Sequence, residues 1–266
     1  MRLIRSAILA VACVGGGWGV VLGQAPDPTQ VLAAAREALG GDTNLSAIKT
    51  FVATGRTRQL RGNNLVPIEF EINCELPDRY VRKDEIPAQD TDLTVTGFSG
   101  EALILFPLAP PGRGAPPPGD GRGRGGGAPG PAQRLAIIKQ DFARLMLGIF
   151  ATSFPGYPLT FTYVALGEAP EGKADILDVA GPANFSARFV VQQQTHLPVM
   201  LTWQLPGADG KPAEYRIYYG DFRNVNRVKW PFRIRRAIGG VTVEETTFDQ
   251  VRFNVKIDPR KFEAPK

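Results

Sequence analysis

Apolar and polar residues alternate with a period of two along most of this chain, which predicts a protein built mainly from β-strands. The alternation is clearest over 69–76. One face there carries Phe70, Ile72, Cys74 and Leu76, and the other carries Glu69, Glu71, Asn73 and Glu75. Such a strand has one face packed on a core and one face in water.

Similar patterns recur on both sides of this strand. We predict strands at 50–60, 79–86, 90–97 and 101–106, and then at 160–166, 173–179, 187–193, 199–205, 214–219, 230–236 and 241–255. Turn residues such as Pro182, Pro198 and Gly239-Gly240 separate them. Because the strands follow one another closely, they must form hairpins. The fold class is therefore mainly β (α+β), with one curved antiparallel sheet of about 11 strands.

Two segments have helical periodicity instead. The first begins at Asp27-Pro28-Thr29 and ends at Gly40-Gly41. The second covers 133–150, where one stripe is apolar. The stripe consists of Leu135, Ile138, Phe142, Leu145, Met146 and Ile149. So wide an apolar face must be covered, either as an ordinary core helix or as a lid over an apolar cavity.

The N-terminus has the pattern of a secretory signal peptide. Arg2 and Arg5 precede an apolar run that extends to Leu22, so we predict a signal peptide at 1–23 and a single mature domain at 24–266. A membrane anchor is the first alternative, but the run is short and rich in glycine. Lipid attachment at Cys13 is the second, although the apolar run continues past it.

Residues 107–131 form a Gly/Pro-rich insert with nine glycines and eight prolines. This composition buries too little apolar surface to order a chain, so we predict a disordered loop. Its run 122–126 resembles the arginine–glycine tails of RNA-binding proteins. The mature chain, however, has 29 basic against 26 acidic side chains, an excess too small to indicate a nucleic-acid partner.

Catalytic and metal-binding patterns are weak. The chain has one histidine, His196, which lies beside a predicted turn, and one mature cysteine, Cys74, which we interpret as a small buried hydrophobe. Residues 97–101 nearly match a nucleophile elbow, but no helical pattern follows them, which favours a turn between strands. The glutamates of 69–76 are interpreted as a solvated face. We therefore expect no enzyme, no metal and no cofactor.

Three local patterns, at 189–199, 219–231 and 253–262, resemble those of bacterial lipoprotein-localisation proteins, the LolA/LolB-like periplasmic carriers and receptors. The first resembles a strand, a "D-x-x-T-x-L-P" turn and the next strand, with Gln192 where aspartate is usual. The second resembles "Y-x-D-(F/Y)-x-x-V-x-G-V-K-(F/W/L)-P", with Arg227 where glycine is usual. The resemblance covers 28–106 and 132–263, and the insert departs from it.

The resemblance implies an incomplete β-barrel whose apolar concave side is covered by helices and holds acyl chains. The expected groove and lid residues are Phe70, Ile72, Phe142, Leu145, Met146, Ile149, Phe189, Leu201, Trp203, Ile217 and Phe232. The expected function is a monomeric periplasmic carrier or sensor of lipid or acylated protein, with a membrane-associated partner protein. The alternative is a structural or protein-interaction module with a filled core.

Overall fold

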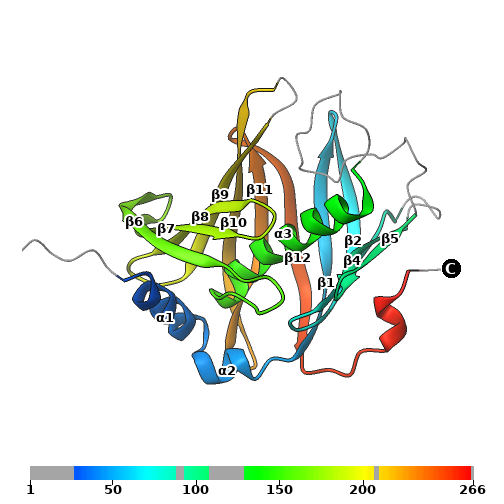
Figure 1. Ribbon diagram of the computed structural model, residues 1–266, viewed down its shortest axis with the longest axis horizontal. Coiled ribbons are helices and arrows are strands. Elements are labelled where there is room, and N and C mark those ends of the chain that lie inside the picture. Colours follow the sequence, from blue (N-terminus) through cyan, green and yellow to red (C-terminus); the bar gives the residue numbers. More distant parts are fainter. Residues whose placement is uncertain (1–26, 88–92, 108–128, 207–209, 265–266) are drawn as a thin grey trace, which may run out of the picture.

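The computed structural model describes residues 27–87, 93–107, 129–206 and 210–264 (Figure 1). The predicted signal peptide, Cys13 and most of the Gly/Pro-rich insert lie outside these residues. The helices are α1 (Pro28–Leu39), α2 (Asp42–Ser46), α3 (Pro131–Phe150) and a short 3-10 helix, η1 (Pro259–Phe262). The strands are β1 (Thr50–Arg61), β2 (Asn64–Glu75), β3 (Arg79–Glu85), β4 (Thr94–Ser99), β5 (Ala102–Phe106), β6 (Thr160–Ala169), β7 (Gly172–Gly181), β8 (Phe185–Gln192), β9 (Pro198–Pro206), β10 (Pro212–Val225), β11 (Val228–Ile238) and β12 (Val241–Phe253).

The strands form one antiparallel sheet in the order β5-β4-β3-β2-β1-β12-β11-β10-β9-β8-β7-β6. Neighbours in the sequence pair as hairpins, and the pairing of β1 with β12 joins the two halves. The sheet curls but does not close, because β5 and β6 remain as its two edges. The predicted incomplete barrel is therefore confirmed, with twelve strands where about 11 were expected.

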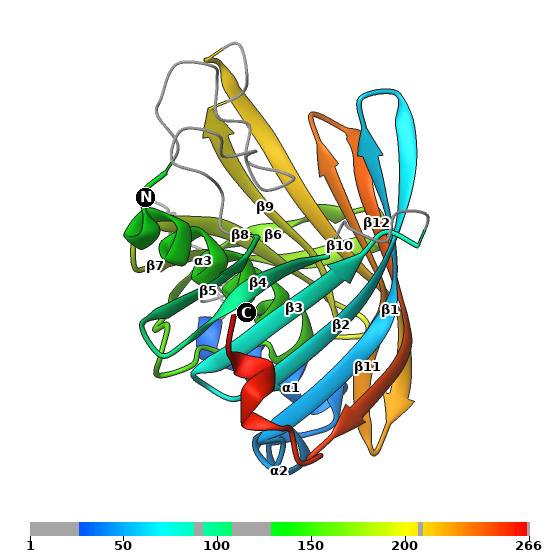
Figure 2. The same cartoon turned by 90° about the vertical axis from the view of Figure 1, so that its right-hand side faces the viewer.

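Helix α3 lies against the concave side of the sheet, which we call the inner face (Figures 1 and 2). It contacts β4 and β5 on one side of the opening and β9 and β11 on the other. Helix α1 begins at Asp27, whose side chain caps the amide of Thr29, and ends at Gly40 as predicted. The Arg36 guanidinium reaches the carbonyl of Phe150 at 2.9 Å, which ties α1 to the end of α3.

The predicted alternation of β2 is confirmed except at Asn73, which was expected on the solvated face but is 4 % exposed and donates a hydrogen bond of 2.7 Å to Glu71. Phe70, Ile72 and Cys74 are buried on the inner face, whereas Glu69 and Glu75 are exposed on the outer face. A satellite cluster on the outer face packs Phe262 of η1 over Val81, Val95 and Ile104. The small helices α2 and η1 were not predicted from the sequence.

Gly55 lies where β1 packs closely against β12 and against Phe70 of β2. A Cβ at Gly55 would lie 2.2 Å from the Thr247 carbonyl oxygen and 2.8 Å from the Phe70 ring. The register between β1 and β12 shifts between Thr54 and Gly55. Irregularities of this kind increase local twist and bend a strand, so glycine here lets the central strands curve around the inner core.

Candidate functional site

The inner face of the sheet and the underside of α3 share one continuous apolar cluster. All the predicted groove and lid residues belong to it. Leu145 is half-buried, and the rest are at most 8 % exposed: Phe70, Ile72, Phe142, Met146, Ile149, Phe189, Leu201, Trp203, Ile217 and Phe232. These side chains pack on one another and on α3, so a ligand in this space would have to take the place of the helix.

Helix α3 lies very close to β10 at Gly148. A Cβ on Gly148 would lie between 2.1 and 2.5 Å from three ring atoms of Tyr219. Only a residue without a side chain fits there, because such distances are far inside van der Waals contact. Glycine, a poor helix former, therefore occupies the point where the helix backbone meets the sheet.

The Tyr219 hydroxyl donates a hydrogen bond of 2.6 Å to the main-chain carbonyl of Arg144, one helical turn before Gly148. Tyr219 is 2 % exposed. Burial raises the pKa of Tyr219 well above its ordinary value, because the phenolate would be poorly solvated. The tyrosine is therefore a neutral donor that holds α3 on the sheet.

The middle of α3 is held by aromatic contacts with the other half of the sheet. The ring of Phe142 lies 5.3 Å from the rings of both Tyr80 on β3 and Phe98 on β4, and 6.4 Å from Phe154. Edge-to-face aromatic pairs contribute about 1 kcal/mol beyond area burial. Phe142 thus connects the helix to β3 and β4, while Tyr219 connects it to β10.

A band of charged residues crosses the inner face between the apolar cluster and the β1–β2 and β11–β12 hairpin tips. We call it the charged rim. It consists of Arg82 and Asp84 on β3, Glu244 on β12, Arg236 on β11, and Asp141 and Arg144 on α3. Pairing registers place the sheet residues on the inner face, since Arg82 lies opposite Ile72 and Arg236 opposite Ile217.

Ion pairs form two groups within the rim, one on β3 and one that connects β12 and β11 to the helix. Arg82 contacts Asp84 at 2.8 Å and the Thr57 hydroxyl at 3.0 Å. Arg236 lies 3.4 Å from Glu244 and 3.9 Å from Asp141. Burial disfavours the charge on Arg236, yet Glu244 and Asp141 outweigh it and hold the Arg236 pKa above its ordinary value. Arg236 therefore carries its charge at neutral pH.

Arg144 is the most deeply buried member of the rim, with 5 % of its side chain exposed. Its guanidinium contacts Asp141 at 3.0 Å and lies 4.3 Å from the ring centre of Trp203 and 5.1 Å from that of Phe185. Burial lowers the pKa of Arg144. The Nε atom of Arg144 and the indole nitrogen of Trp203 are both buried without a hydrogen-bond partner among the described residues.

Sequence reasoning missed the rim, because it considered only the apolar stripe of the helix at 133–150 and left Arg144 outside it. Strand parity carried a usable signal, because Arg82 and Arg236 occupy inward positions of β3 and β11. An arginine at an inward position of a predicted strand is ordinarily interpreted as an edge or turn residue. The carboxylates that allow its charge to be buried come from distant segments of the chain.

The remaining sequence candidates occupy ordinary structural positions. His196 is exposed in the β8–β9 turn, Cys74 is fully buried, and residues 97–101 comprise the end of β4 and the turn at Gly100 that leads to β5. Each of these agrees with its predicted interpretation. Burial raises the pKa of the Cys74 thiol well above its usual range, which makes it unreactive.

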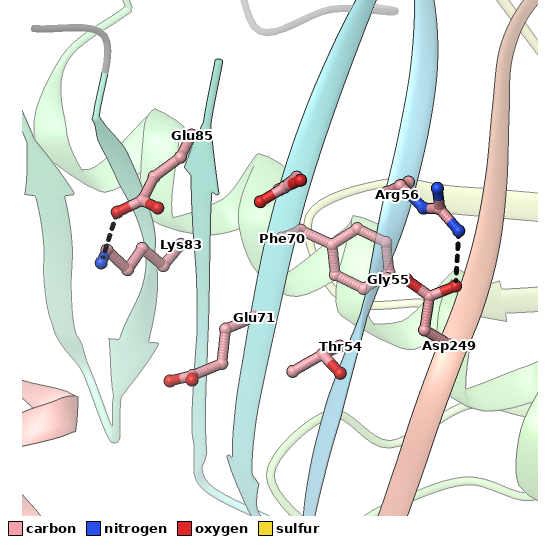
Figure 3. Close-up of a pocket in the computed structure, with 9 residues that line it drawn as sticks. Thr54, Gly55, Arg56, Phe70, Glu71, Lys83, Glu85 and Asp249 are labelled. Atoms are coloured by element: carbon pink, nitrogen blue, oxygen red, sulfur yellow. Dashed lines mark hydrogen bonds and ion pairs between the residues drawn. The ribbon is translucent and has the colours of Figure 1, made fainter. Parts of the chain in front are cut away.

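The outer face carries a shallow hollow of about 400 Å³, bordered mainly by polar side chains of β1, β2, β3 and β12 (Figure 3). Arg56 contacts Asp249 at 3.2 Å, Lys83 contacts Glu85 at 2.6 Å, and Glu71 is contacted by Lys261 at 2.8 Å. Glu69 adds a further carboxylate to the lining, so the hollow has an excess of negative charge that disfavours an anionic ligand.

Within the described part of the chain, no group of three or more histidine, cysteine or acidic residues is placed to hold a metal ion. No helix in that part combines the length and hydropathy that a membrane span requires.

Solved structures with the same architecture are LolA-like. A LolA superfamily protein from Nitrosomonas europaea superposes with a TM-score of 0.55 at 13% identity, covering 90% of this chain and 98% of its own. An outer membrane lipoprotein-sorting protein domain from Vibrio parahaemolyticus superposes with a TM-score of 0.52 at 9% identity, covering 89% and 97%. No family model and no curated protein matches the sequence. The chain therefore has a LolA-like fold.

Proposed function

We propose that this protein is an exported, non-catalytic carrier or sensor that holds acyl chains of a lipid or lipoprotein between the inner face and α3. The observation that carries the proposal is the way α3 spans the opening of an unclosed sheet. Helix α3 lies over the apolar inner face and contacts β4 and β5 as well as β9 and β11, while α1 packs on the same cluster beside β6 and β11.

The energetics of exchange favour an acyl chain as the occupant. A buried methylene gains about 0.8 kcal/mol, so a long chain offers a gain comparable with the apolar contacts of α3. The helix is also separable from the sheet, because its backbone hydrogen bonds are internal. Displacing it would break side-chain packing, the Tyr219 hydrogen bond and the polar contacts of Lys139, Gln140, Asp141 and Phe150 with other elements, but no strand pairing.

Export supports the same function. The predicted signal peptide at 1–23 would place the mature domain in the periplasm of a bacterial cell, where acylated proteins and lipids need carriers. N-terminal sequencing of the exported protein should begin near Gln24. A chain that still begins at Met1, or that is acylated at Cys13, would contradict the localisation.

Mass spectrometry of organic extracts from the purified mature protein tests the acyl-chain proposal. We expect an acyl-containing molecule at a defined ratio to protein. The control replaces the exposed apolar residues Leu65, Leu166 and Val241 with serine, which removes surface stickiness and leaves the inner face intact. Lipid that is absent from the wild type, or lost from this control, would contradict the proposal.

The second candidate function is a protein-interaction module with a filled core. Phe189, Leu201 and Ile149 have at most 1 % exposure and already fill the inner face together, which favours a permanently docked α3. In that case the purified protein contains no lipid, binds no acyl probe, and uses another surface to bind a partner protein.

A further inference from the structure

We infer that the charged rim binds the anionic headgroup, a carboxylate or phosphate, of a single-chain amphiphile whose acyl chain lies under α3. This inference rests on the proposed function and names the ligand class for the same face. The two parts of the site match the two parts of such a ligand. The apolar cluster suits the acyl chain, and the adjoining rim carries three guanidinium groups that suit the anionic headgroup.

Stability alone does not account for the rim. Removing paired charges from water costs several kcal/mol per ion, and well-packed apolar residues in place of a buried ion pair are often as stable or more so. Apart from the buried polar residues Thr57, Gln59 and Thr246 beside the rim, the inner face is apolar and shows that the fold tolerates such residues there. Three arginines on this face therefore call for a role beyond packing.

The arginines also have donor capacity that their own carboxylates do not fill. Charge-assisted pairs of good geometry measure about 2.7–2.9 Å, whereas Arg236 lies 3.4 Å from Glu244 and 3.9 Å from Asp141. A planar guanidinium binds a carboxylate or phosphate with two parallel hydrogen bonds. Arg236 is one-quarter exposed, so an entering anion can reach it without complete opening of the protein.

A second, independent observation points to a missing acceptor. The buried Arg144 Nε and Trp203 Nε1 both lack a partner among the described residues, and the Arg144 guanidinium lies 4.3 Å from the Trp203 ring centre. Buried donors without acceptors are uncommon in folded proteins. Each of these two buried donors, on residues that contact one another, suits an anionic oxygen.

The distribution of charge within the rim favours an anion over a cation. Each guanidinium has a carboxylate nearby, but Asp141 is 42 % exposed and shares its charge between Arg144 and Arg236. Water screens an exposed carboxylate more than a buried guanidinium. Around Arg144, on the interior side of the rim, the charge balance is therefore more positive, whereas Glu244 beside Arg236 is itself only 13 % exposed.

Two chain-matched ligands test the inference: 1-oleoyl lysophosphatidic acid, which is anionic, and 1-oleoylglycerol, which is neutral. Binding is followed by tryptophan fluorescence below micelle-forming concentrations. We expect the wild type to prefer the anionic ligand by about tenfold or more, as hydrogen bonds to a charged group provide. Arg236→Gln should bring the preference close to one.

Arg233→Gln is the matched control, because Arg233 lies on the same strand, is 57 % exposed and pairs with Glu245 on the outer face. It should keep the wild-type preference. Circular dichroism reports whether Arg236→Gln folds. If this variant does not fold, the preference of the wild type between the two ligands decides the test. Equal affinity of the wild type for both ligands would overturn the headgroup inference and leave the proposed function standing.

If the wild type binds neither ligand, the proposed function fails and the inference fails with it. Glycerol 3-phosphate separates the two possible sources of the anion. At the concentrations used for the lipids it should not displace lysophosphatidic acid. Displacement by glycerol 3-phosphate at equal concentration would overturn the lipid assignment in favour of a site for free phosphate compounds.

Discussion

The Tyr219 hydroxyl donates a 2.6 Å hydrogen bond to the main-chain carbonyl of Arg144 in the interior of the protein. One turn later, the missing side chain of Gly148 makes room for the ring of the same tyrosine. These two contacts fix α3 to β10. If α3 exchanges with an acyl chain, weakening them should shift the protein toward the binding-competent state.

Tyr219→Phe should destabilise the protein by about 1 kcal/mol, because it removes one buried hydrogen bond and little volume. If the binding-competent state has α3 displaced, the apparent affinity for a fluorescent fatty acid should rise by up to about fivefold. Urea unfolding and probe titration on one preparation measure both. Tyr218→Phe, which changes the neighbouring tyrosine on the outer face, should leave affinity unchanged. Lower stability with unchanged affinity would identify α3 as a permanently docked helix.

Gly148→Ala should destabilise the protein even though alanine is the better helix former by about 1 kcal/mol. The new methyl carbon would lie 2.1 to 2.5 Å from atoms of the Tyr219 ring. Overpacking of this kind costs about 1–3 kcal/mol. Gly130→Ala is the control, since nothing lies within 4 Å of a Cβ at that position. Thermal unfolding compares the two variants. An equal or higher melting temperature for Gly148→Ala would show that the contact is not as tight as described.

Alkaline pH should destabilise the protein partly through Tyr219. Because burial raises its folded-state pKa, the unfolded state releases the proton first. The stability contribution is complete below the unfolded pKa of about 10 and is lost as pH rises through the folded value. Tyr219→Phe should therefore lose less stability than the wild type between pH about 9 and 11. Parallel losses in both proteins would contradict this, although Tyr80, whose pKa burial also raises, contributes to the slope in both.

The strands and the two long helices could be predicted because their signals are local. Alternation located β2, and the Asp27 cap and Gly40 bounded α1. The extended hairpins were not predicted: β2 begins at Asn64 and continues through Pro67, and β10 continues through Gly220 to Val225. Pairing with β1 and β11 stabilises these segments, and strand pairing between distant segments leaves little trace in local composition.

The apolar side of the site could be predicted and the charged side could not. Periodicity placed Phe142, Met146 and Ile149 on the buried stripe of α3. Arg144 has the same helical neighbours, but its burial depends on Trp203, Phe185 and the Tyr219 hydrogen bond, all from strands more than forty residues away. Tertiary packing therefore determines whether an arginine such as Arg144 gains these partners and is buried.

The central claim, that acyl chains occupy the inner face, can be tested with a fatty acid that carries bromine on its chain. In a chain beginning at Gln24 the only tryptophans are Trp203 and Trp230, and both are buried in the inner cluster. Bromine quenches indole fluorescence at close range. We predict that dibromostearic acid quenches the fluorescence saturably while stearic acid does not, and that Trp203→Phe and Trp230→Phe each retain quenching of the other indole. Unquenched fluorescence at saturating dibromostearic acid would contradict the claim.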